Sequence, residues 1–87
     1  MAKWMEDLAD RFDLPAEALA GVPRITLTGS GRVLIENHRG LLAYTGELVE
    51  VSGGRLRIRI RGDGLTLRAM DQDSLLITGT IFGVDTE

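Results

Sequence analysis

The chain has 87 residues, 44% of them hydrophobic and 26% charged, with a formal net charge of −3 at pH 7. This length suits one domain, and the composition is typical of a folded protein rather than a disordered one. Because the chain has no cysteine and one histidine, disulfides, thiolate catalysis, cysteine-based metal sites and multi-histidine sites within one chain are excluded. We therefore expect no cofactor and no metal, and we expect self-association to supplement the small core.

Residues 1–22 are predicted to form an N-terminal helical segment. Trp4, Leu8 and Phe12 recur every four residues, which places them on one face of an amphipathic helix. Pro15 limits this helix because the residue before a proline avoids the α region. The three apolar side chains form a candidate interaction face, either for the protein's own sheet or for a second chain.

The same segment is acidic and lacks targeting features. Residues 1–20 carry five Asp or Glu side chains against two basic ones, without the apolar run of a signal peptide. No part of the chain approaches the roughly 18 consecutive apolar residues of a membrane span. We therefore expect a cytoplasmic protein with no membrane span of its own, and the negative charge argues against nucleic acid as the main partner.

From residue 23 onward, apolar and polar residues alternate, which predicts β-strands separated by glycine-rich turns. The strand candidates recur about every 8–10 residues, the spacing of an antiparallel sandwich or barrel. We predict a β domain over residues 23–87, a small antiparallel β-sandwich or partly open barrel of about seven or eight short strands. The candidates are residues 25–28, 32–37, 41–45, 48–51, 56–60, 65–69, 75–78 and 81–84. A short β-solenoid is the alternative, although no consensus motif repeats from strand to strand.

The most regular strand candidate carries four arginines. Side chains alternate across a strand, so Arg55, Arg57, Arg59 and Arg61 should share one face, each about 6.6–6.8 Å from the next. One interpretation is a solvated face that discourages aggregation at a sheet edge. The other is a stripe that binds anions or nucleic acid, because guanidinium groups suit carboxylates and phosphates. Nearby acids should offset these charges, and the acidic N-terminal segment is one candidate.

A second cluster consists of Glu36, Asn37, His38, Arg39 and Gly40. A hydrolase centred on His38 with Glu36 is one hypothesis, but catalysis would need a nucleophile or substrate group in reach and a group that orients the ring. Consecutive residues in a strand or tight turn face different directions. We therefore interpret the cluster as a strand end and turn in which Asn37 and His38 bond to the backbone, and we predict no catalytic residue.

The segment Ile35-Glu36-Asn37-His38-Arg39-Gly40-Leu41-Leu42 also carries a resemblance, together with residues 14–15, 22–29, 44–48 and 75–81. This series resembles the YabP/YqfC family of endospore-forming bacteria, the YqfC branch in particular. Glu36, Asn37, His38, Arg39 and Gly40 match the family's recurrent motif, to which no catalytic role is attached. The resemblance also implies a β-sandwich-like domain.

The resemblance further implies a role in sporulation, in the mother-cell compartment, with a membrane-associated partner of the YqfD type through which the protein would reach the forespore membrane. The sequence and the resemblance together predict a non-enzymatic protein-interaction or self-assembly module. The alternative is an anion-binding or nucleic-acid-binding module that uses the arginine face.

Overall fold

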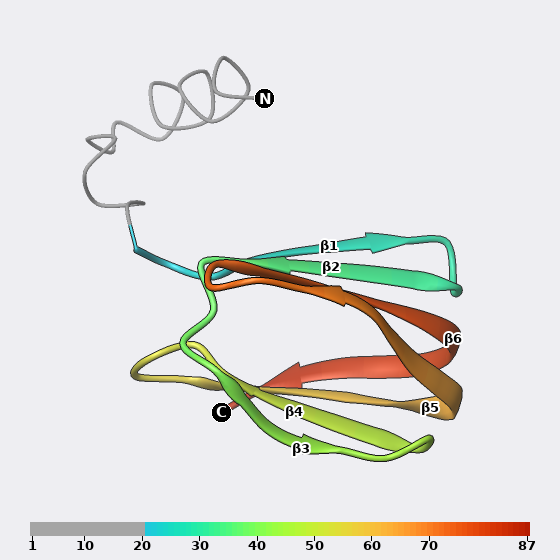
Figure 1. The fold of residues 1–87 in the computed structure, drawn as a ribbon. Coiled ribbons are helices and arrows are strands. Elements are labelled where there is room, and N and C mark those ends of the chain that lie inside the picture. The colour runs from blue at the N-terminus through green and yellow to red at the C-terminus, as the bar shows by residue number, and fades with distance from the viewer. Residues whose placement is uncertain (1–20) are drawn as a thin grey trace, which may run out of the picture.

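The computed structural model describes residues 21–87 and shows an all-β domain (Figure 1). The predicted helix with Trp4, Leu8 and Phe12 lies outside the described residues, so it and the boundary at residue 22 stay predictions. Six strands form one antiparallel sheet in the order β1-β2-β6-β5-β4-β3. They are β1 (Arg24–Thr28), β2 (Arg32–Glu36), β3 (Leu41–Tyr44), β4 (Leu48–Ser52), β5 (Arg57–Met70) and β6 (Ser74–Thr86). The antiparallel all-β prediction is confirmed, and antiparallel pairing throughout this sheet does not fit a β-solenoid.

Two long strands fold this single sheet into two layers (Figure 1). The β1–β2 hairpin pairs with the first part of β6, through residues 74–78, whereas the β3–β4 hairpin pairs with the first part of β5, through residues 57–61. β5 and β6 pair with each other along most of their length and pass from one layer to the other. The sheet is therefore shaped like a sandwich but is not closed into a barrel.

The strand count is lower than the sequence predicts, because neighbouring candidates merge. Residues 56–60 and 65–69 belong largely to the 14-residue β5, and residues 75–78 and 81–84 both belong to the 13-residue β6. Gly62-Asp63-Gly64 lies between the predicted strands 56–60 and 65–69, where a glycine-rich turn is expected, but it is instead a stretch where the β5–β6 register shifts. Such bulges bend a strand without ending it. At the bend, a Cβ added to Gly62 would collide with the carbonyl oxygen of Thr80, so glycine permits this close approach.

The turns of the β3–β4 and β1–β2 hairpins bond to β5 and β6 where the register of these two long strands shifts. In the β3–β4 turn, the carbonyl of Glu47 accepts the N–H of Gly62 at 3.0 Å, and its neighbour accepts the N–H of Leu65 at 2.8 Å. In the β1–β2 turn, the carbonyl of Ser30 accepts the N–H of Ile81 at 2.8 Å. These bonds satisfy backbone groups that the register shifts remove from the ladder.

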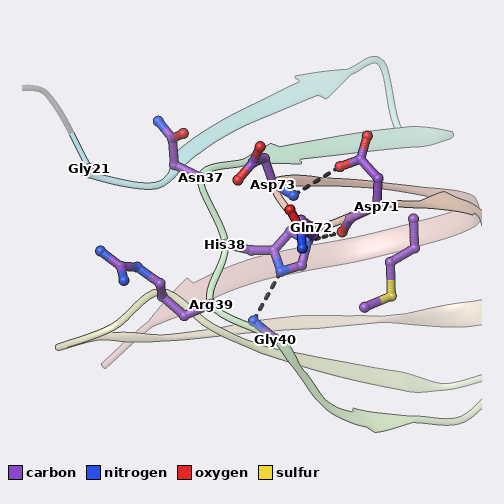
Figure 2. Close-up of a pocket in the computed structure, with 9 residues that line it drawn as sticks. Gly21, Asn37, His38, Arg39, Gly40, Asp71, Gln72 and Asp73 are labelled. Carbon is purple, nitrogen blue, oxygen red and sulfur yellow. Dashed lines mark hydrogen bonds between the residues drawn. The ribbon is translucent and has the colours of Figure 1, made fainter.

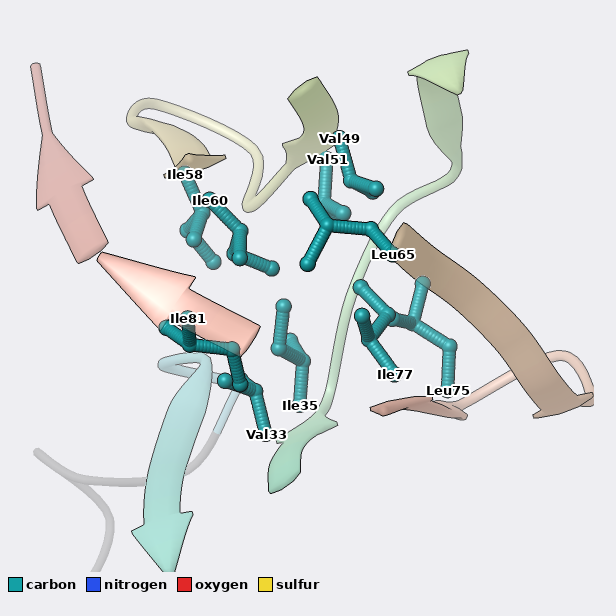
Figure 3. Packing of buried hydrophobic residues seen from close by; sticks show 10 residues of the cluster. All are labelled: Val33, Ile35, Val49, Val51, Ile58, Ile60, Leu65, Leu75, Ile77 and Ile81. Atoms are coloured by element: carbon teal, nitrogen blue, oxygen red, sulfur yellow. The ribbon is translucent and has the colours of Figure 1, made fainter. Parts of the chain in front are cut away.

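The core lies between the two layers, and the hydrophobic residues buried there within residues 21–87 are all aliphatic (Figure 3). One layer contributes alternate residues of β2 and β6, and the other contributes alternate residues of β4 and β5. The buried side chains are Val33, Ile35, Val49, Val51, Ile58, Ile60, Leu65, Leu75, Ile77 and Ile81. Burial of this apolar surface is the main term that stabilises the fold.

Candidate functional site

His38 lies in the connection that leads from β2 in one layer to β3 in the other (Figure 2). It is 5% exposed and is the one buried polar or charged residue among residues 21–87. Its Nδ1 accepts the backbone N–H of Gly40 at 3.0 Å, and its Nε2 lies 3.0 Å from the backbone carbonyl oxygen of Asp71. The backbone N–H of His38 donates to the carbonyl of Asp73 at 3.2 Å. His38 therefore joins the β2–β3 connection to the β5–β6 turn.

These two partners determine the tautomer of the imidazole. An N–H from Gly40 points at Nδ1, so Nδ1 must be the unprotonated acceptor. The proton is then on Nε2, where it is donated to the carbonyl of Asp71. Both ring nitrogens are engaged by backbone groups, so neither is left to take a proton from a substrate. The expectation that His38 bonds to the backbone is confirmed.

The residues on either side of His38 shape the connection through their backbone. Asn37 has φ 62°, a left-handed conformation in which Asn is among the few tolerated side chains. Gly40 has φ 129°, which favours glycine strongly. The Nδ2 of Asn37 also donates to the carbonyl of Val22 at 3.3 Å, so Asn37 too bonds to the backbone, as the sequence predicts. Together these conformations bring the N–H of Gly40 back toward the ring of His38.

Glu36 and Arg39 have partners of other kinds. The Oε1 of Glu36 lies 3.4 Å from the Nε of Arg24, in an ion pair between β2 and β1. The backbone N–H of Arg39 donates to the carbonyl of Ser52 at 2.7 Å, while the residue itself is exposed. Glu36 and Arg39 therefore make contacts separate from the hydrogen bond between His38 and Gly40, and the hydrogen bonds of His38 do not involve Glu36.

Asp71 organises the turn that His38 holds. Its Oδ1 accepts the N–H groups of Asp73 at 2.9 Å and of Ser74 at 2.7 Å. These two bonds to the carboxylate, from Asp73 first and Ser74 second, lower the pKa of Asp71 below its ordinary value. Residues 71–74 lie between the predicted strands 65–69 and 75–78, but the sequence contains no signal that Asp71 would contact His38.

A pocket of about 570 Å³ lies beside this contact (Figure 2). Its lining is Gly21, Asn37, His38, Arg39, Gly40, Met70, Asp71, Gln72 and Asp73. Residues 37–40 of the motif thus line a pocket in which both nitrogens of the His38 imidazole already bond to backbone groups. Within residues 21–87, no three His, Asp or Glu side chains are grouped so that they could hold a metal ion.

The arginine stripe has three members on the strand rather than four, because Arg55 lies in the turn before β5 begins. Acids of the neighbouring strands offset the others. Glu50 of β4 lies 3.7 Å from Arg57 and 3.8 Å from Arg59. Asp85 of β6 lies 2.9 Å from Arg61. At the end of the described chain, Glu87 lies 3.2 Å from Arg59. Acids near the stripe were expected, and they are present in β4, in β6 and at Glu87 after β6. The acidic N-terminal segment lies outside the described residues, so its part in offsetting the stripe stays a prediction.

The charge of the β domain is balanced as a whole. Five of the thirteen acids and two of the ten basic residues lie in residues 1–20, so residues 21–87 have eight of each. The net charge of the chain therefore resides in its first twenty residues. The arginine face is part of a neutral surface of ion pairs rather than an unopposed cationic stripe.

Among the described residues there is no helix of the length and apolar character needed to cross a membrane. No solved structure matches the chain. The family model described as "YabP family" matches residues 20–85. The chain is also similar to a protein of Bacillus subtilis (strain 168) named "Uncharacterized protein YqfC", with 31% identity over 74 residues. This match covers 85% of this chain and 80% of that relative. The expected resemblance is thereby confirmed: the chain belongs to the YabP family.

Proposed function

We propose that the protein is a non-enzymatic protein-interaction module of sporulation, which binds a membrane-associated partner of the YqfD type in the mother cell. The observation that carries the proposal is the double engagement of His38. Nε2 of the buried imidazole donates a hydrogen bond to the carbonyl of Asp71, and Nδ1 accepts one from the N–H of Gly40. A general base needs a nitrogen in reach of the substrate proton, and here both nitrogens serve the fold.

The surface of the β domain supports binding to another protein. Large apolar side chains remain exposed on the strands, among them Leu27, Leu42 and Phe82. The sheet ends in two edge strands, β1 and β3, at the two ends of the strand order. Open edges and apolar surface are features by which proteins add strands or dock partners. The process and the partner are inferred from membership of the YabP family and the likeness to YqfC.

Co-purification tests this proposal. The full-length protein and its YqfD-type partner are produced together in detergent, and the tagged protein is captured. We expect the partner in the eluate. The comparison is a Phe82→Asp variant, in which a charged side chain replaces an exposed apolar one. Circular dichroism of this variant shows whether the sheet is intact. Failure of the wild-type protein to retain the partner, with both proteins folded, would count against the proposed role.

A further inference from the structure

We propose that the edge of β1 is a self-association surface, on which β1 of a second copy pairs antiparallel to give a symmetric dimer. The proposal rests on the proposed role as an interaction module and names one surface and its occupant. β1 lies at the end of the sheet, with β2 on one side only (Figure 1). An edge strand presents a row of backbone N–H and C=O groups that can pair with another chain.

The hydrogen-bond pattern shows which groups β1 presents. The carbonyl of Gly31 accepts the N–H of Gly79, so the carbonyls of odd-numbered residues in β2 face β6. The even-numbered residues of β2 therefore face β1, and the register pairs them with the even-numbered residues of β1. The N–H and C=O groups of Ile25 and Leu27 consequently point away from the sheet.

The two edges of the sheet differ in how well they could accept a strand. In β3 the pairing with β4 shifts register between Leu41 and Ala43, and such a bulge is a common protection of an edge. β1 pairs with β2 over all five of its residues without a shift. After Arg24, which pairs with Glu36, β1 contains no charged residue and no proline. Among residues 21–87, β1 is thus a regular edge strand that has no bulge and, after Arg24, no charged residue or proline to protect it.

One antiparallel register of β1 on itself uses every outward group. In it, Ile25 lies opposite Leu27 of the second copy, and Leu27 lies opposite Ile25. Each of these pairs can exchange both N–H···O bonds. Thr26 then lies opposite its own equivalent at the twofold axis, and Thr–Thr pairs across strands are favourable. Arg24 lies opposite Thr28, so no like charges face each other.

This self-complementarity identifies a second copy as the occupant. The side chains of Ile25 and Leu27 share the inner face with their partners Ile35 and Val33 in β2. Leu27 is 51% exposed although it lies on the inner face, because no described strand lies beyond the free edge of β1 to cover it. Apolar contact with Ile25 of a second copy would cover it. A two-strand interface with the same residues on both sides is the isologous arrangement of a twofold dimer.

Light scattering on the full chain tests the dimer. The wild-type protein should have about twice its chain mass of 9.5 kDa at high concentration. Thr26→Lys should shift it to the monomer mass, because two lysines would then meet at the axis. Thr26→Glu should do the same, and mixing the two variants should restore the dimer mass. Thr66→Lys, at another exposed strand threonine, is the matched control and should remain dimeric.

Disulfide trapping gives a second readout because the chain has no cysteine of its own. Thr26→Cys should crosslink across the axis under mild oxidation, since directly opposite residues of this kind lie about 4.5 Å apart at Cα. Thr66→Cys should not crosslink. A monomeric wild-type protein, a Thr26→Lys dimer, or a folded Thr26→Cys protein without crosslinks would each overturn the β1 dimer. A monomer that still retains the YqfD-type partner would leave the proposed function standing, whereas a β1 dimer that retains none would overturn only that function.

Discussion

The imidazole of His38 donates a hydrogen bond from Nε2 to the backbone carbonyl of Asp71 across 3.0 Å, between residues 33 apart in the sequence. This bond ties the connection between the two layers to the β5–β6 turn. On its other nitrogen, the ring accepts the N–H of Gly40, which begins the approach to β3. The segment that contains His38 and Gly40 is thus a junction between parts of the chain that are distant in sequence.

Removal of the imidazole should destabilise the domain. His38→Ala would leave the part-buried carbonyl of Asp71 and the part-buried N–H of Gly40 without their partner, and leaving such groups unsatisfied costs about 1–3 kcal/mol. Urea unfolding followed by circular dichroism measures the change in free energy of unfolding. Arg39→Ala is the control, because its side chain is exposed, and it should stay within about 0.5 kcal/mol of wild type. Equal stability of all three proteins would contradict the structural role of His38.

The bend of β5 should be intolerant of a side chain at Gly62. Gly62→Ala would force a Cβ against the backbone carbonyl of Thr80, which cannot move aside as a flexible side chain can. Overpacking of this kind costs about 1–3 kcal/mol. Gly46→Ala is the matched control, since a Cβ there would meet nothing within 4 Å. Thermal unfolding of the two variants should show a large loss for the first and little change for the second.

The turn at Asp71 should make stability depend on acid pH. The N–H groups of Asp73 and Ser74 hold the pKa of Asp71 below its ordinary value. A lowered pKa in the folded state contributes stability above the ordinary range of aspartate, and this is lost as the pH falls through the lowered value. Asp71→Ala should therefore have a lower Tm than wild type at neutral pH, with a gap that narrows in acid. Asp63→Ala, at another exposed aspartate, is the matched control. A gap that is constant with pH would contradict this account.

The arginine face should not bind nucleic acid in a salt-sensitive way. Arg57 and Arg59 share Glu50, so the stripe already has its counter-charges. Fluorescence anisotropy with labelled single-stranded DNA is measured at low salt. The wild-type protein should show no binding that is lost in the Arg57→Glu/Arg59→Glu double variant. Glu50→Gln is the sensitive comparison, because it removes the shared carboxylate. Tight wild-type binding that is lost in the double variant would favour the anion-binding alternative instead.

Much of the fold is readable from the alternation of apolar residues. Ile58 and Ile60 are buried and Arg57 is exposed, as a period of two requires. The two long strands could not be read in the same way. Gly62-Asp63-Gly64 has the composition of a turn, and its role as a bend depends on contacts with Thr80 and Glu47, which are remote in sequence.

The candidate site shows the same division between local and distant effects. That Asn37 and His38 would bond to the backbone follows from their place at a strand end, and the structure shows both bonds. That His38 would meet Asp71 depends on how the layers stack, for which the sequence carries no signal. The hydroxyl of Tyr44 accepts the N–H of Leu67 at 3.0 Å. This contact between β3 and β5 likewise could not be predicted from the sequence.

Nitrogen-15 NMR of the histidine side chain tests whether both ring nitrogens of His38 bond to the backbone, because His38 is the only histidine of the chain and its signals are unambiguous. We expect, at neutral pH, a single neutral tautomer protonated at Nε2, with Nδ1 showing the shift of an unprotonated acceptor. A charged imidazolium, a tautomer protonated at Nδ1, or an averaged signal from a freely exchanging ring would contradict it. Any of these results would show that the imidazole is not held by its two backbone partners, and a chemical role for His38 would then be open again.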